Sequence, residues 1–292
     1  MANTHPIDDA LAQMKAAGFG ALELAIATEG VLTIGSTEAD CQAIRGQIDA
    51  SGLHVSTVAS GMSWGTNPLS DDPAVRELSN TQVEAALQRV AWLGCEAFLY
   101  VPGIVGCPFV PDEKVRYDHA LARCRENLER LLPNCEKLGV DLCLENVWNG
   151  FLTSPIELRD FIDSLGSDRL GVYFDVGNCL GYHQHPPHWI ELLGHRIKRV
   201  HVKDFKHDFD WQGSYDFCEL GEGDVPWDET LAALRALPGG GYDKTVIAEM
   251  LPYKPGRLEP TAAFLKQWID RFSDSSKPTP SIALSRTKID LP

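Results

Sequence analysis

Three carboxylates each end a short run of apolar residues, namely Glu145, Asp175 and Glu249, and His201 lies inside a fourth run. A hydrophobic core would not select acidic or imidazole side chains there. A single such carboxylate is more often a salt-bridge partner or helix cap, but carboxylates that converge raise each other's pKa unless a cation lies among them. One divalent metal ion with three oxygen ligands and one nitrogen ligand is therefore the simplest explanation. Mn²⁺ is our first choice, and Mg²⁺, Co²⁺ or Zn²⁺ suit the same donors.

The segments that must position these side chains alternate between two kinds. Seven have the short, apolar, β-branched character of buried strands: Ala21–Ile26, His54–Ala59, Ala97–Val101, Val140–Glu145, Leu170–Asp175, Arg199–Asp204 and Thr245–Met250. Helical periodicity marks Ile7–Ala17, Asp72–Leu93, Tyr117–Leu138, Ser154–Leu165, Pro187–Leu193, Trp227–Leu237 and Pro260–Phe272. The alternation predicts parallel βαβ units and the α/β class, as a (β/α)8 TIM barrel.

A closed TIM barrel needs eight strands, and no strand precedes the helix Ile7–Ala17. We therefore predict a barrel that lacks its first strand and is open at that edge. Residues 1–272 form one catalytic domain in this interpretation, and residues 273–292 form a polar C-terminal tail. The apolar piece Ile282–Leu284 offers a cover for the gap, but we favour a mobile tail.

Long connections leave the carboxyl ends of three predicted strands: Ser60–Asp71, Pro102–Arg116 and Phe205–Pro226. Connections that return from helix to strand are short. TIM-barrel sites are built from the loops that follow the strands, so this asymmetry places the site at the end where the four polar side chains lie.

Composition excludes several classes of protein. The 292 residues include 26 Lys and Arg against 41 Asp and Glu, a net charge of -15, which disfavours nucleic acid as a partner. The eight cysteines are scattered, without the spacing of a zinc finger or of a disulfide framework. Neither a signal peptide nor an apolar membrane span is visible in the sequence. We expect a cytoplasmic protein without a membrane partner.

Four motifs together resemble one family: Leu144–Trp148, Tyr173–Asn178, Val200–Asp204 and Gly221–Trp227. They are similar to the sugar-phosphate isomerase/epimerase family, the xylose-isomerase-like TIM barrels, over roughly Ile7 to Phe272. Within it, ketose 3-epimerases and L-ribulose-/L-xylulose-5-phosphate 3-epimerases look nearest. The resemblance implies a metal bound by Glu145, Asp175, His201 and Glu249, with the two glutamates as the catalytic acid/base pair.

The expected reaction is removal of a proton next to a ketone, which passes through an enediolate. It needs a base on one face of the substrate, an electrophile at the carbonyl oxygen and, for epimerisation, an acid on the opposite face. Glu145 and Glu249 come from strands three positions apart around the ring, which is compatible with opposing faces.

The expected substrate is a small sugar or sugar phosphate. Asn178 stands where the free-ketose epimerases resemble one another in having a histidine, which favours the phosphate branch. Candidate phosphate-binding cations are Lys203, Lys206, Lys254 and Arg257. It is equally consistent with the sequence that these four are ordinary charged residues of the surface. Trp64 and Trp148 either stack on a sugar or pack at the rim. We name Trp64, Trp148, Lys203 and Arg257 as candidate substrate-binding residues.

Alternatives stay open. An inosose-type dehydratase resembles the same family and would use the same metal ligands. A catalytically inert barrel that serves as a binding subunit is a third alternative. An open barrel edge would also allow a homo-oligomer. Endonuclease IV shares the barrel, but its zinc site needs a histidine at the place of Asn178. A nearby histidine group (His183, His185 and His188) suits a polar loop better than a second metal site.

Overall fold

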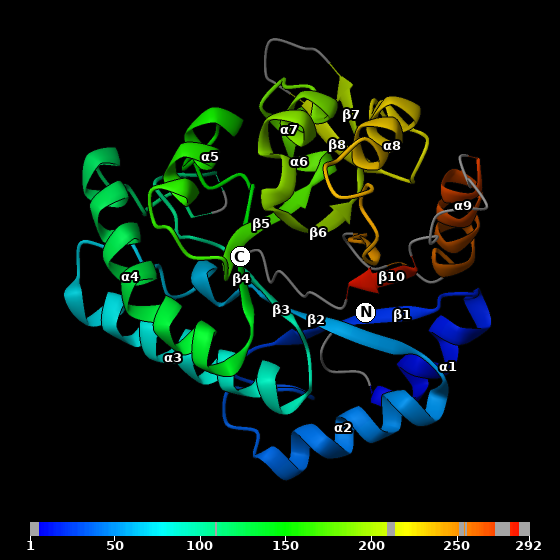
Figure 1. The fold of residues 1–292 in the computed structure, drawn as a ribbon, viewed down its shortest axis with the longest axis horizontal. Coiled ribbons are helices and arrows are strands. Elements are labelled where there is room, and N and C mark those ends of the chain that lie inside the picture. The colour runs from blue at the N-terminus through cyan, green and yellow to red at the C-terminus, as the bar shows by residue number, and fades with distance from the viewer. Residues whose placement is uncertain are drawn as a thin grey trace.

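A closed barrel of eight parallel strands forms the centre of the molecule (Figure 1). The computed structural model describes residues 6–108, 110–208, 214–250, 254, 256–271 and 281–285. Around the barrel the strands follow the order β1-β10-β9-β6-β5-β4-β3-β2. Their bounds are β1 Ala21–Ile26, β2 His54–Ser60, β3 Ala97–Tyr100, β4 Asp141–Glu145, β5 Leu170–Asp175, β6 Ile197–Val202, β9 Val246–Ala248 and β10 Ile282–Ser285.

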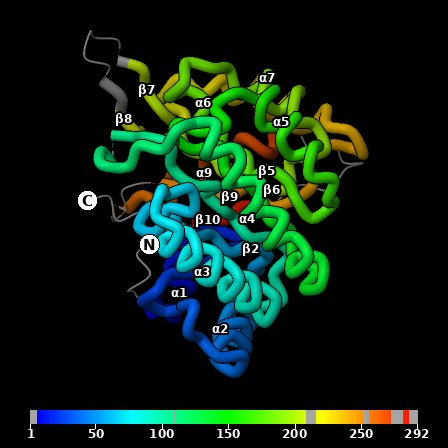
Figure 2. Tube along the Cα trace, turned by 90° about the vertical axis from the view of Figure 1, so that its left-hand side faces the viewer, coloured from blue at the N-terminus to red at the C-terminus, as the bar shows by residue number. Residues whose placement is uncertain are grey.

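Helices cover the outside of the barrel (Figures 1 and 2). They are α1 Ile7–Ala17, α2 Glu38–Ser51, α3 Pro73–Trp92, α4 Tyr117–Leu138, α5 Pro155–Asp163, α6 Val176–Gly181, α7 Pro186–Leu193, α8 Trp227–Arg235 and α9 Leu258–Asp270, with short 3-10 turns η1 Met62–Trp64 and η2 Gly194–Arg196. Local sequence explains several starts. Thr37 and Asp40 form a capping box before α2, and prolines occupy the first positions of α3, α5 and α7. None of the described helices combines the length and apolar character that a membrane crossing requires.

Strand β10 corrects the prediction of an open barrel that lacks a strand. Its residues pair in parallel with Val246–Ala248 of β9 on one side and with Ala21–Glu23 of β1 on the other. The apolar piece Ile282–Leu284 therefore fills the place that a strand before α1 would occupy. Parallel strands must be paired on both sides to leave no edge, and this segment satisfies both neighbours. Residues 273–280 and 286–292 of the predicted tail lie outside the described residues.

An antiparallel hairpin follows β6 in the segment that was predicted as a long loop. Its strands are β7 Asp204–Asp208 and β8 Ser214–Cys218, and the hairpin projects from the barrel (Figure 2). Asp204 anchors the chain that returns from it. The buried Asp204 carboxylate accepts hydrogen bonds from the backbone N–H groups of Gly221, Gly223 and Val225 and from Trp227 Nε1.

The core has two parts that follow from the alternation of side chains along each strand. One lies between the barrel and the helices. The other lies inside the barrel, where small and branched side chains predominate: Ala21, Ala59, Ala97, Leu99, Val101, Cys143, Val147, Tyr173, Ile247 and Ala283. The interior also holds fully buried polar residues, and these belong to the site.

Candidate metal centre

The four predicted ligands come together in the barrel. Glu145 and Asp175 end β4 and β5, His201 lies on β6, and Glu249 directly follows β9. One ligand atom from each residue lies within 4.8 Å of the others, and all four residues are buried. Parallel strands bring their carboxyl ends to the same face, so side chains far apart in the sequence meet there.

Two buried atoms indicate where a cation fits. Within the described residues, His201 Nδ1 has no hydrogen-bond partner, and Asp175 Oδ2 accepts no hydrogen bond but lies 3.2 Å from Lys203 Nζ. His201 Nδ1 lies 4.0 Å from Asp175 Oδ2 and 4.0 Å from Glu145 Oε1. Two ligand atoms at about 2.1 Å from a shared ion are at most about 4.2 Å apart. The donor set suits one divalent ion, and the two separations of 4.0 Å lie within this limit. The four ligand atoms lie within 4.8 Å of one another, so a small inward movement of the side chains would let all four bind the same ion.

Lys203 places a positive charge against the same carboxylates. Its Nζ donates to Glu249 Oε2 at 2.6 Å and lies 3.2 Å from Asp175 Oδ2. Burial lowers the pKa of Lys203, but the charges of Asp175, Glu249 and Glu145 outweigh it and raise this pKa above its ordinary value. The ammonium therefore stays charged and offsets part of the cluster's negative charge.

Burial and the close charges of the cluster shift the pKa values of its carboxyl groups and of its imidazole. Burial, followed by the charge of Glu249, raises the pKa of Glu145 to about 8. Burial also raises the pKa of Asp175, against the charge of Lys203. Burial lowers the pKa of His201, but the carboxylate of Glu23 and other acids raise it to about 9 overall. Mutual repulsion of this kind is what a divalent cation would relieve.

Two asparagines orient the ligands. Asn146 accepts from the Asp175 backbone N–H through Oδ1 at 2.8 Å and donates through Nδ2 to the Asp175 carbonyl at 2.9 Å. Asn178 donates its backbone N–H to Asp175 Oδ1 at 2.8 Å, and its Nδ2 lies 3.4 Å from Glu145 Oε1. Asn178 therefore contacts a predicted ligand, in a role that the sequence analysis did not assign to it.

Sequence reasoning also missed Glu23 and Tyr173. Glu23 lies on β1, fully buried, and accepts hydrogen bonds from the Tyr173 hydroxyl and, at 2.8 Å, from His201 Nε2. The signal was present, because a glutamate inside the apolar run Ala21–Ile26 is as unexpected as the strand-end carboxylates.

The two predicted substrate-binding tryptophans differ in surroundings. Trp64 ends η1, is partly buried and packs against the cluster inside the barrel. Trp148 stacks on Phe217 of the hairpin, with ring centroids 5.2 Å apart, and its Nε1 donates to the Asn178 carbonyl at 2.9 Å. Trp148 thus holds the hairpin against the loop that follows β4, as the rim-packing interpretation describes.

The predicted cations are largely held by carboxylates. Arg257 is buried, and its Nε donates to Glu219 Oε1 at 2.7 Å. Lys203 is bound by the cluster itself, whereas Lys206 and Lys254 are exposed. The two buried cations therefore already have anionic partners.

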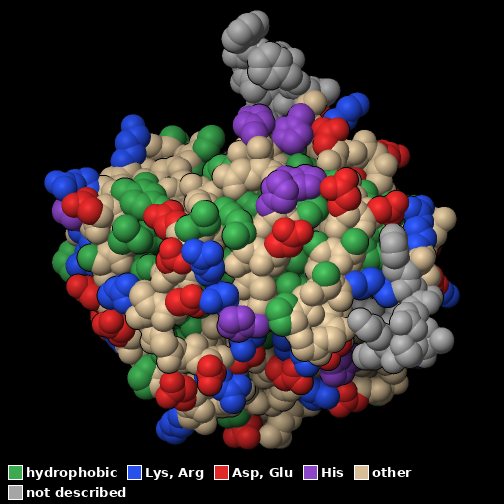
Figure 3. Space-filling view, turned by 45° about the horizontal axis from the view of Figure 1, so that its top comes forward, with side chains coloured by type: hydrophobic (Ala, Val, Ile, Leu, Met, Phe, Trp, Pro, Cys, Tyr) green, Lys and Arg blue, Asp and Glu red, His purple; other side chains and the backbone are tan. Residues whose placement is uncertain are grey.

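The additional histidines lie at the surface, where Figure 3 shows imidazole side chains gathered on one part of the molecule. His185 Nε2 lies 3.1 Å from Glu229 Oε2, and the His183 ring stacks on His207 with centroids 5.4 Å apart. Over the residues that the structure describes, the metal-ligand geometry is found only in the four-residue cluster.

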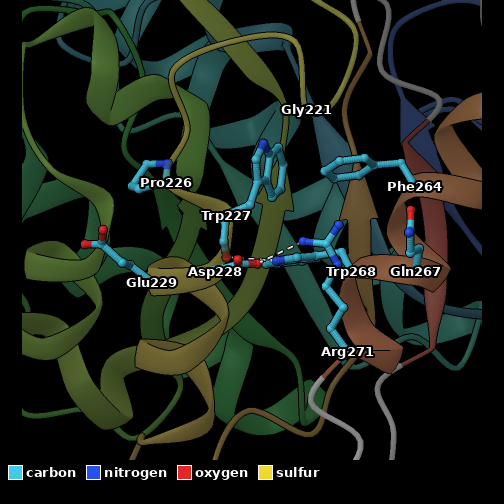
Figure 4. Close-up of a pocket in the computed structure, with 9 residues that line it drawn as sticks. All are labelled: Gly221, Pro226, Trp227, Asp228, Glu229, Phe264, Gln267, Trp268 and Arg271. Atoms are coloured by element: carbon cyan, nitrogen blue, oxygen red, sulfur yellow. Dashed lines mark hydrogen bonds and ion pairs between the residues drawn. The ribbon is translucent and has the colours of Figure 1, made fainter.

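A separate pocket of about 370 Å³ lies between α8 and α9 (Figure 4). Trp227, Phe264 and Trp268 line it, and an ion pair joins Asp228 to Arg271 across 3.2 Å. It shares no residue with the four-residue cluster.

Comparison with known proteins identifies the family. A family model described as a xylose isomerase-like TIM barrel matches residues 11–270. The chain belongs to this family. Among curated proteins, this xylose isomerase-like barrel is similar to the 3-oxo-isoapionate decarboxylase of Pectobacterium atrosepticum, with 26% identity over 228 residues that cover 67% of this chain and 76% of that protein.

Two solved structures share the architecture. An L-ribulose 3-epimerase has a TM-score of 0.71 and 17% identity, with 93% of this chain and 94% of that chain covered. A xylose isomerase-like TIM barrel protein from Mycobacterium smegmatis in complex with magnesium has a TM-score of 0.70 and 17% identity, with 91% of this chain and 89% of that chain covered. At these identities the likeness establishes the fold.

Proposed function

We propose that this xylose isomerase-like barrel is a divalent-metal-dependent isomerase or epimerase of a ketose or ketose phosphate. The observation that carries the proposal is the convergence of Glu145, Asp175, His201 and Glu249, buried and within 4.8 Å of one another. Family membership and the epimerase among the structural neighbours support the same class of reaction. Mn²⁺ remains our first choice of metal, and the magnesium complex of a neighbour makes Mg²⁺ the next.

The four side chains would hold the ion. Asn146 would fix the backbone of Asp175, and Asn178 would keep the carboxylate oxygens of Asp175 and Glu145 oriented. When bound, the ion would act as a Lewis acid that polarises the substrate carbonyl and stabilises the negative charge left by proton removal. The protein itself supplies the acid/base groups and a buried setting that strengthens their electrostatic interactions with the reacting atoms.

Glu145 and Glu249 each carry a carboxyl group that can exchange a proton with the substrate. In the metal-free protein, burial and the charge of Glu249 raise the pKa of Glu145 to about 8, and a bound ion would lower it. Glu249 accepts a hydrogen bond from the Lys203 ammonium. Strands β5 and β6 separate β4 from β9, so the two glutamates approach the substrate from different sides. One glutamate removes a proton from the carbon, and the other, already protonated, delivers a different proton to the opposite face, which inverts the carbon. Exchange with solvent then restores both glutamates.

The buried cations favour a free ketose over a phosphate. A phosphate at Arg257 would have to displace Glu219, and one at Lys203 would approach three carboxylates. This weighs against the phosphate preference that Asn178 suggested from the sequence.

The test incubates the protein with Mn²⁺ in D₂O and a panel of ketoses and ketose phosphates, followed by NMR. We expect deuterium at the carbon next to the carbonyl together with an epimer or isomer. Glu145→Gln and Glu249→Gln should each lower turnover at least about a hundredfold, the usual scale for loss of a positioned acid or base. Glu96→Gln is the matched control, because Glu96 precedes β3 at the opposite barrel end and pairs with Arg199. Absence of exchange with every candidate would contradict the proposal.

A second candidate reaction is decarboxylation of a 3-oxo acid. The curated relative from Pectobacterium atrosepticum favours it. In that reaction the bond to the carboxyl carbon breaks, carbon dioxide leaves, and the electron pair is protonated by an acid of the site. Adding 3-oxo sugar acids to the panel separates the two, because only decarboxylation releases carbon dioxide.

A further inference from the structure

Glu23 makes a contact across the barrel interior that neither the strand order nor the proposed ligand set explains. Between β1, which carries Glu23, and β6, which carries His201, lie β10 and β9. Nevertheless His201 Nε2 lies 2.8 Å from Glu23 Oε1, and both side chains have no exposed surface. The contact therefore arises from side chains that reach across the interior.

The hydrogen bond determines which imidazole nitrogen is available. Since a carboxylate can only accept, Nε2 of His201 must carry the hydrogen. The lone pair of a neutral ring is then on Nδ1, the nitrogen that lies 4.0 Å from Glu145 and 4.0 Å from Asp175 and has no hydrogen-bond partner among the described residues. The ring thus presents an acceptor nitrogen to the space between the carboxylates.

We propose that Glu23 is the positioning residue of the metal site, fixing the tautomer and ring orientation of His201 so that Nδ1 binds the ion. The inference rests on the proposed metal site and deepens it. A carboxylate bonded to the far nitrogen of a metal-binding histidine also increases the basicity of the nitrogen that faces the metal.

Tyr173 holds Glu23 in place. Its hydroxyl donates to Glu23 Oε2, which leaves Oε1 to His201, and its ring packs against the imidazole with centroids 4.5 Å apart. Three side chains from β1, β5 and β6 therefore lock one another inside the barrel. Burial of a carboxylate is costly unless both oxygens are hydrogen-bonded, and this arrangement satisfies both.

A purely structural role for Glu23 would give a different result. Loss of a buried carboxylate that only supports packing would lower the free energy of unfolding without a selective loss of metal affinity. The test is therefore Mn²⁺ binding to the purified, metal-depleted protein, followed by the EPR signal of free Mn²⁺. It needs no substrate and no turnover.

We expect Glu23→Ala to weaken Mn²⁺ binding about 10- to 100-fold, the usual effect of removing the partner of a metal-binding histidine. Glu23→Gln should weaken it less, because the amide oxygen still accepts from Nε2. Tyr173→Phe should also weaken it less than Glu23→Ala, because Glu23 loses one partner but keeps the contact with His201. Tyr242→Phe is the matched control, since it removes a hydrogen bond from a tyrosine hydroxyl to the Thr245 carbonyl and leaves both partners of Glu23 in place, and it should leave the affinity unchanged.

A second measurement does not depend on the folding of any variant. In ¹⁵N-histidine-labelled wild-type protein loaded with Zn²⁺, NMR should show His201 with hydrogen on Nε2 and metal on Nδ1. Metal on Nε2, or equal Mn²⁺ affinity in folded Glu23→Ala and wild type, would overturn the role of Glu23 alone. Failure of the wild type to bind any divalent ion would overturn the metal site and this role with it.

Discussion

At the scale of single residues, the site combines three carboxylates, one imidazole and one ammonium in a buried volume. The ammonium of Lys203 contacts two of the acids that we propose as metal ligands. Protons and Lys203 therefore both compete with a metal for the same negative charge. The balance between them makes metal affinity depend on pH.

We expect the affinity for Mn²⁺ to rise with pH from about 6 to about 9. In the metal-free protein the pKa of Glu145 is raised to about 8 and that of His201 to about 9, so both hold protons at lower pH. Metal binding must release these protons, and the apparent affinity should increase up to about tenfold per released proton and pH unit below each pKa. Above about pH 9 it should level off.

Calorimetric titration in two buffers of different ionisation enthalpy checks this, because it counts the protons released. The count should exceed one near pH 7 and fall toward zero above about pH 9. An affinity independent of pH over this range would show that neither group is a ligand.

At the scale of elements, Asp204 organises the chain that returns from the hairpin to α8. Its carboxylate accepts from the backbone of Gly221, Gly223 and Val225. Gly223 has no room for a side chain there, because an added Cβ would lie 2.2 Å from Asp204 Oδ1. One acid thus determines the conformation of a segment next to the site.

Replacing Asp204 by Ala should lower the free energy of unfolding by about 3–5 kcal/mol, because several N–H groups lose their acceptor. Urea unfolding measures the loss. Asp216→Ala on the exposed part of β8 is the control and should lie within about 0.5 kcal/mol of wild type. An equal effect of the two substitutions would contradict the anchoring role of Asp204.

The sequence predicts many of the helices and strands and fails where the local sequence signal is weak. Strands β1 and β5 and helices α1 and α4 have the predicted bounds, because their apolar periodicity is strong. The sequence does not predict helix α2, and it predicts a loop where the hairpin lies. Glu23 lies in the middle of an apolar run, so a pattern of polar residues at strand ends does not include it.

At the scale of the whole molecule, barrel closure depends on Ile282–Ser285. The sequence shows an apolar run, Ile282–Leu284, that offers a cover for the gap, but three apolar residues in a polar segment are too few to predict a strand. The pairing with β1 on one side and β9 on the other shows their role. That pairing is a property of the closed barrel and cannot be read from the local sequence alone.

Ending the chain after residue 272 should separate β1 from β9 and remove the support between Glu23 and Glu249. In β10, Ser285 pairs with Glu23 and Leu284 with Ala248, next to Glu249. We expect loss of cooperative thermal unfolding and of Mn²⁺ binding. A chain ending after residue 286 retains β10 and is the matched control, which should keep both. Cooperative unfolding of the shorter chain with wild-type metal affinity would disprove the dependence.

The position of β10 also sets an order of events during synthesis. When residues up to Asp270 have left the ribosome, all four proposed ligands and every other barrel strand are already present, but β1 and β9 have no partner between them. The ring can close only after Ile282–Ser285 has emerged, and pairings so distant in sequence form slowly. The nascent protein would therefore expose two unpaired strand edges until Ile282–Ser285 has been made, which makes this interval the period of greatest exposure to misassembly.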